Sequence, residues 1–132
     1  MRVFVTGAAG FIGSGVVPDL IAAGHTVTGL ARSDANVKTL KRMGADVLRG
    51  SLEDIDSLKR GSAEADGVIH LAFIHDFAKF AENGQIDKRA IEAMGETLTG
   101  TNKPLVVTSG VGLLAPGRLS TEEDVAHVGE SI

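Results

Sequence analysis

Apolar residues along this chain alternate between short continuous runs and longer stretches with a helical period. The continuous runs have the length and β-branched character of strands that are buried on both faces. They predict strands at residues 3–5, 26–31, 46–49, 67–72 and 104–109. The periodic stretches predict helices from residue 11 to a stop at 24, at 34–43, at 54–60 and over most of 76–100. Such an alternation is typical of a parallel sheet covered by helices on both sides.

Two of these helices contain residues that disfavour a helix. Pro18 removes a hydrogen bond to the Ser14 carbonyl, so we expect a bend there but no break. Gly84 is expected to interrupt the last helical stretch. The first helix should bury Phe11, Ile12, Val16, Val17, Leu20 and Ile21. The last should bury Phe77, Phe80, Ile91, Met94 and Leu98.

Right-handed crossovers between parallel strands would give a doubly wound α/β sheet of about five strands in the order 3-2-1-4-5. We expect this sheet to occupy residues 1–110. Residues 111–132 contain a proline and an acidic run but no periodic apolar face, which predicts a loop or a disordered tail.

Three evenly spaced glycines follow the first strand, in the order Gly7-Ala8-Ala9-Gly10-Phe11-Ile12-Gly13. The first allows a sharp turn, the second lets the backbone approach a pyrophosphate, and the third lets the helix pack on the sheet. The following helix N-terminus offers free N–H groups to phosphate. This context predicts a Rossmann-type dinucleotide site formed by Gly7, Ala9, Gly10, Phe11, Ile12 and Gly13. The alternative is a glycine-rich turn without a ligand.

The segment TGAAGFIG resembles the TGxxGxxG motif of the short-chain dehydrogenase/reductase superfamily, and most of all its extended branch, the NAD-dependent epimerase/dehydratase family. HTVTGLARS, ADVLRGSLED, DGVIHLAF and KPLVVTSG resemble later strands and turns of that family. The resemblance implies that Ser51 and Leu52 form the adenine loop, although the family often has aspartate in place of Ser51. It also implies that Leu71, Ala72 and Phe73 lie beside the ribose. Core packing is the alternative for Leu71.

Arg32 and Ser33 stand where dinucleotide folds carry an acidic residue for the ribose 2′-hydroxyl. A guanidinium pairs with a 2′-phosphate that a carboxylate would repel. The sequence therefore favours NADP over NAD, unless Arg32 is only a solvated surface charge.

The superfamily's catalytic pair, Tyr-x-x-x-Lys after the fifth strand, is missing, because the chain contains no tyrosine. It also stops before the sixth and seventh strands and the substrate lobe that the resemblance implies. Ser109 is the candidate for the assisting hydroxyl, with Thr108 as another, although Gly110 could occupy that position. A capped strand end is the alternative for Ser109.

The charge balance points to no nucleic acid and no membrane surface as partner, since the net charge is -4 and the basic residues are scattered. The chain has no cysteine, no signal-like N-terminus and no long apolar run, which fits a cytoplasmic protein. We expect no metal site, because four histidines lack ligand spacing, and His70 reads as a satisfied core residue.

The sequence thus predicts the NADP-binding N-terminal part of an oxidoreductase, epimerase or dehydratase, acting on a small hydroxyl- or carbonyl-bearing substrate, with a sugar-like molecule as one candidate. Without tyrosine, the chain as given is expected to be inactive alone. The alternatives are a non-catalytic NADP sensor, or a subunit completed by a second copy or another protein. A third is an atypical reductase that uses His75 as its acid.

Overall fold

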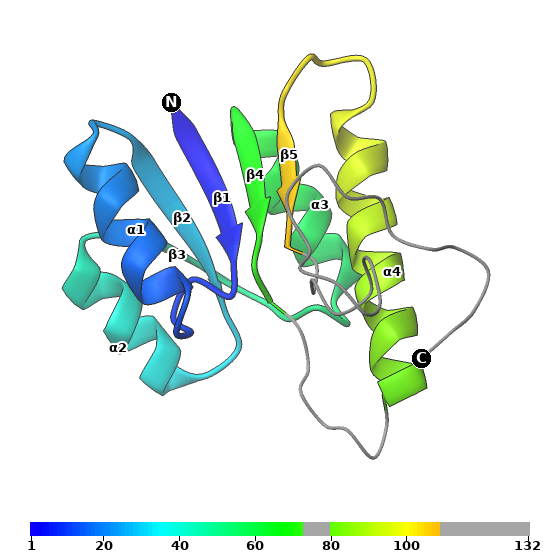
Figure 1. The fold of residues 1–132 in the computed structure, drawn as a ribbon, viewed down its shortest axis with the longest axis horizontal. Helices are drawn as coiled ribbons and strands as arrows, with labels where there is room; N and C mark the ends of the chain where they lie inside the picture. Colours follow the sequence, from blue (N-terminus) through cyan, green and yellow to red (C-terminus); the bar gives the residue numbers. More distant parts are fainter. Residues whose placement is uncertain (73–79, 109–132) are drawn as a thin grey trace, which may run out of the picture.

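The computed structural model describes residues 1–72 and 80–108, which form a single parallel sheet flanked by helices (Figure 1). The sheet has five strands in the order β3-β2-β1-β4-β5, which confirms the predicted topology. Its strands are β1 (Arg2–Thr6), β2 (Thr26–Ala31), β3 (Asp46–Arg49), β4 (Gly67–His70) and β5 (Leu105–Val107). The helices are α1 (Gly13–Ala22), α2 (Asp34–Met43), α3 (Ile55–Glu64) and α4 (Phe80–Leu98).

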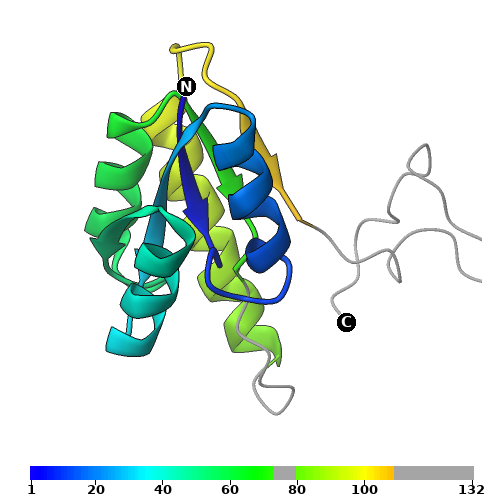
Figure 2. The same cartoon turned by 90° about the vertical axis from the view of Figure 1, so that its left-hand side faces the viewer.

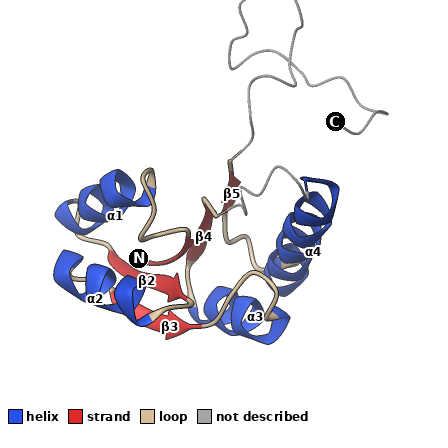
Figure 3. Ribbon diagram, turned by 90° about the horizontal axis from the view of Figure 1, so that it is seen from below, coloured by secondary structure: helices blue, strands red, loops and turns tan. Residues whose placement is uncertain are grey.

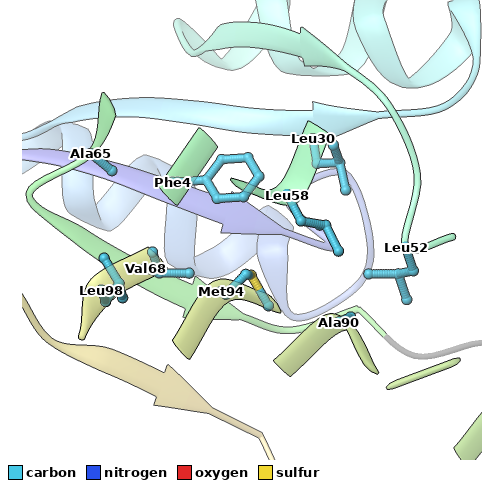
Figure 4. Packing of buried hydrophobic residues seen from close by; sticks show 9 residues of the cluster. All are labelled: Phe4, Leu30, Leu52, Leu58, Ala65, Val68, Ala90, Met94 and Leu98. Carbon is cyan, nitrogen blue, oxygen red and sulfur yellow. The ribbon is translucent and has the colours of Figure 1, made fainter. Parts of the chain in front are cut away.

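Helices α1 and α2 cover one face of the sheet, and α3 and α4 cover the other (Figure 3). Figure 2 shows the strands between α1 and α3. Side chains of β1 alternate between the two layers, because successive residues of a strand point to opposite faces. Val3 and Val5 pack under α1 and α2, whereas Phe4 packs under α3 and α4. Figure 4 shows the second of these cores, where Met94 of α4 lies beside Val68 of β4. Met94 is fully buried and Leu98 is nearly so, as the sequence predicted.

Helix α1 begins later than predicted, at Gly13. Phe11 is 96% exposed and Ile12 is 51% exposed, so the prediction that both lie on the buried face of the helix is wrong. They belong instead to the turn that connects β1 to α1. The buried face of α1 consists of Gly13 and the fully covered Val17, with Leu20 and Ile21 at its edge.

Helix α4 runs without interruption through Gly84, so the predicted break there is wrong. A glycine inside a helix costs only about 0.5–1 kcal/mol relative to alanine, which a helix of 19 residues tolerates. Helix α1 is likewise unbroken at Pro18. Helix α3 runs past its predicted end to Glu64, and at Gly61 the ring of Phe4 packs directly against the helix. The predicted tail at 111–132 and the predicted burial of Phe77 lie outside the described residues.

Candidate functional site

A cleft of about 670 Å³ opens at the carboxyl ends of the strands, the edge to which the arrowheads of Figure 1 point. It lies beside the boundary between β1 and β4. The connection that follows β1 leads to β2 on one side of this boundary, and the connection that follows β4 leads to β5 on the other. Ligands of doubly wound folds bind at this point, because loops diverge there and leave a crevice. The cleft is lined by Gly7, Ala9, Gly10, Phe11, Ile12, Leu30, Arg32, Asn36, Gly50, Ser51, Leu52, Glu53, Leu71 and Ala72.

The first and third glycines of the turn are required by its geometry. Gly7 has a φ of +69°, and a Cβ atom added to it would lie 2.7 Å from the backbone nitrogen of Ala72. A Cβ atom added to Gly13 would overlap the carbonyl oxygens of Gly7 and Ala8. Side chains at these two positions are therefore excluded by backbone atoms, which have little freedom to move. Gly13 packs in the interior and, unlike the other predicted residues of the turn, does not line the cleft.

The turn leaves backbone donors available for an anionic ligand. Within the described part of the chain, the N–H groups of Phe11, Ile12 and Gly13 have no hydrogen-bond acceptor. Ile12, the N-cap residue of α1, makes no side-chain capping bond, and the first turn of α1 carries no acidic residue. Free amides at the positive end of a helix form an anion site. The turn thus has the chemistry to hold a pyrophosphate.

The end of β2 presents a cation to the cleft. Arg32 is exposed and lines it, directly after the buried Ala31. The nearest carboxylate in sequence, that of Asp34, pairs with Arg49 at 3.2 Å. Among the described residues, Arg32 makes no ion pair. Its guanidinium is therefore available to a ligand.

Ser33, which the sequence also assigned to the cofactor, does not line the cleft. Its hydroxyl caps helix α2 by accepting a hydrogen bond from the backbone N–H of Asn36 at 3.2 Å. Asn36 itself lines the cleft one turn into α2, a position that sequence reasoning missed. The sequence could have indicated Asn36, because a serine N-cap at position 33 places the first turn of α2 directly after Arg32.

The loop between β3 and α3 forms the far side of the cleft, which Ser51 and Leu52 line, and Leu52 is largely buried. Gly50 and Glu53 also line this side, and Leu30 joins them from β2; none of the three was predicted. Gly50 packs tightly against the side chain of Ser57, which explains a glycine at the end of β3.

The end of β4 lies beneath the glycine turn, and there Leu71 and Ala72 line the cleft. The histidine that precedes them, His70, is 2% exposed. Its Nδ1 lies 2.6 Å from Thr6 Oγ1 and its Nε2 lies 2.6 Å from Asp87 Oδ1. The prediction of a satisfied core histidine is confirmed.

The remaining candidates, Phe73, His75 and Ser109, lie outside the described residues. In residues 1–72 and 80–108, no group of three or more histidine, aspartate or glutamate side chains is placed to hold a metal ion. None of the helices described is long and apolar enough to cross a membrane.

Residues 3–114 match the model of the NAD dependent epimerase/dehydratase family. The chain belongs to this family. An uncharacterized protein of Schizosaccharomyces pombe is 53% identical over 123 residues, and the match covers 92% of this chain and 42% of that protein. Dihydroflavonol 4-reductase of Hordeum vulgare is 33% identical, with 83% of this chain and 35% of the reductase covered. The chain thus spans less than half the length of these relatives.

Solved structures share the fold. UDP-glucose 4-epimerase of Thermotoga maritima superimposes with a TM-score of 0.75 and 26% identity, covering 96% of this chain and 45% of the epimerase. The enzyme of the same name from Bifidobacterium longum, solved with NAD+ and UDP, gives a TM-score of 0.73 at 23% identity, covering 96% and 43%. The chain is therefore an NAD(P)-binding domain of the epimerase/dehydratase type.

Proposed function

We propose that this chain is the NADP-binding part of a reductase or epimerase that acts on a small hydroxyl- or carbonyl-bearing substrate. We assign the nucleotide-binding fold to residues 1–110 and the nucleotide itself to the cleft at the strand ends. The observation that carries the proposal is the glycine turn with its unpaired amides, which faces Arg32 across one cleft. Phosphate groups suit both, because the amides and the guanidinium are hydrogen-bond donors with positive charge or dipole.

The preference for NADP rests on the charges at the end of β2. An acidic residue at this position would accept hydrogen bonds from the ribose hydroxyls of NAD and repel a 2′-phosphate. The chain has Ala31 and Arg32 there, and Asp34 is engaged by Arg49. Glu53 is the acidic residue that lines the cleft, but it belongs to the loop after β3. Together these charges favour a ligand with an additional phosphate near Arg32.

Titration of the purified chain with NADP and with NAD tests this assignment. We expect NADP to bind more tightly, and Arg32→Ser to weaken NADP binding by about 10- to 100-fold, since hydrogen bonds to charged groups contribute about 1.5–3 kcal/mol. NAD binding should change by less than about threefold, because NAD lacks the 2′-phosphate.

Arg60→Ser is the matched control, because it removes the same charge from an exposed position on α3 that does not line the cleft. It should leave both affinities unchanged. Tighter binding of NAD than of NADP by the unchanged chain would refute the cofactor assignment.

The substrate class is supported by the names of the relatives, which include a dihydroflavonol 4-reductase and a 2-alkyl-3-oxoalkanoate reductase.

The family's Tyr-x-x-x-Lys pair is not among the 132 residues, which contain no tyrosine. We therefore propose that the chain binds the nucleotide and that turnover needs residues beyond those given. Hydride-transfer assays with the chain alone should show no turnover. Robust turnover would refute the proposal that catalysis needs residues outside these 132.

A further inference from the structure

A chain of buried polar side chains runs from helix α4 to the floor of the cleft. Thr6 of β1 and His70 of β4 are register partners on neighbouring strands. Thr6 is fully buried and His70 is 2% exposed, while Asp87 of α4 is 21% exposed. Asp87 contacts His70 at 2.6 Å, and His70 contacts Thr6 at 2.6 Å. Strands β1 and β4 and helix α4 are thus connected by two short hydrogen bonds.

The positions of the protons follow from the bonds of Thr6. Its hydroxyl oxygen accepts from the backbone N–H of Ala72 at 3.3 Å and from that of Leu71 at 3.2 Å, and the Leu71 N–H is shared with the Thr6 carbonyl oxygen at 3.1 Å. A hydroxyl has one proton and two acceptor lone pairs, so the proton remains for the bond to His70 Nδ1. Nδ1 must then be an acceptor, and the ring carries its proton on Nε2. From there it donates to the carboxylate of Asp87, which fixes the orientation of the ring.

The two amides that Thr6 holds belong to the floor of the cleft. Leu71 and Ala72 both line it, and the nitrogen of Ala72 is the atom that a Cβ on Gly7 would approach to 2.7 Å. The bond from Ala72 to Thr6 therefore fixes the spacing between the end of β4 and the glycine turn. Complete burial excludes Thr6 from acting as a nucleophile.

We propose that Asp87 is a positioning residue for the nucleotide site, acting through His70 and Thr6 on the Leu71–Ala72 backbone. Asp87 does not line the cleft, and its effect on binding depends on this hydrogen-bond chain. The inference rests on the proposed nucleotide-binding function. It gives helix α4 a role in nucleotide binding, although none of its described residues lines the cleft.

NADP affinity of paired variants of the 132-residue chain tests the inference. Thr6→Val keeps the shape but removes the hydroxyl, and Asp87→Leu removes the acceptor. Each should weaken NADP binding about five- to tenfold, the size expected for the loss of one ordinary hydrogen bond. Thr6→Ser and Asp87→Asn keep the required groups and should bind within about twofold of the unchanged chain.

Ser62→Ala is the matched control, because it removes a buried hydroxyl that has no hydrogen-bond partner among the residues the structure describes and does not line the cleft. It should leave the affinity unchanged. An equal loss of affinity in Ser62→Ala, or unchanged affinity in both Thr6→Val and Asp87→Leu, would overturn the inference.

Two measurements without nucleotide separate this inference from the proposed function. The ¹⁵N resonances of His70 should show the proton on Nε2, and the Ala72 amide should exchange with solvent faster in Asp87→Leu than in Asp87→Asn. A proton on Nδ1, or equal exchange in the two variants, overturns the network. If instead both results hold but the unchanged chain binds neither NADP nor NAD, the proposed function fails and the network is only structural.

Discussion

The cleft has two walls that differ in what they offer a ligand. The backbone wall is the glycine turn 7–13, which presents unpaired N–H groups and almost no polar side chain. The side-chain wall consists of Arg32, Asn36, Ser51 and Glu53, which come from the ends of β2 and β3 and the first turn of α2. Amides suit the pyrophosphate, which all dinucleotides share, whereas the opposite wall is the one we propose for the adenosine end, where NAD and NADP differ.

From this difference we infer that nucleotide binding and cofactor selectivity have separate structural bases in the proposed site. The backbone wall depends on the absence of side chains at Gly7 and Gly13, so substitutions there should affect every dinucleotide alike. The side-chain wall depends on the identity of a few groups, so substitutions there should change one cofactor more than the other. The Arg32→Ser titration tests the second statement, and the variants below test the rest from the largest expected effect to the smallest.

Gly13→Ala should have the largest effect. Its Cβ would overlap the carbonyl oxygens of Gly7 and Ala8, so the turn must shift. We expect a loss of about 1–3 kcal/mol in the free energy of unfolding, as for overpacked sites. NADP and NAD should both bind at least about tenfold more weakly, because the amides move away from the pyrophosphate. Denaturant unfolding and titration with both nucleotides measure these changes.

Gly15→Ala provides the control for that variant. Gly15 lies in the same helix, and a Cβ added to it would meet no other part of the described structure within 4 Å. It should leave both affinities unchanged. A change in selectivity between NADP and NAD in Gly13→Ala would contradict the division between the two walls.

Ser33→Ala should lower stability without a large change in binding. The hydroxyl caps α2, and loss of such a cap costs about 0.5–2 kcal/mol. NADP affinity should change by less than about threefold, because Ser33 does not line the cleft. Thermal unfolding of Ser33→Ala beside Ser33→Asn, which keeps a capping side chain, separates the two effects. A tenfold or larger loss of NADP affinity would instead place Ser33 in the side-chain wall.

Gly84→Ala should have the smallest effect, and it should act on neither wall. A Cβ at Gly84 meets nothing within 4 Å among the described residues, and alanine favours a helix by about 0.5–1 kcal/mol. We expect a slightly higher melting temperature and unchanged affinity for both nucleotides. A lower melting temperature would show that α4 needs a flexible point at this position.

Periodicity sufficed to predict most of the fold. The strands at 26–31 and 46–49 and the helix at 34–43 have the bounds that the sequence predicted, because their apolar pattern and flanking residues agree. It failed at Phe11 and Ile12, where a continuous apolar pattern crosses from a turn into a helix. It failed again at Gly84, because helix propensity is weak beside the packing of the long α4.

The sequence by itself determined the sheet order and the backbone wall, since both follow from local patterns: alternating elements, and glycines spaced three apart beside a strand. Tertiary structure decided the rest. Asn36 and Glu53 reach the cleft, and Asp87 reaches His70, only because parallel strands bring loops and helices from distant parts of the chain together. Such contacts leave no local pattern, because the partners belong to different elements whose relative positions only the assembled sheet fixes.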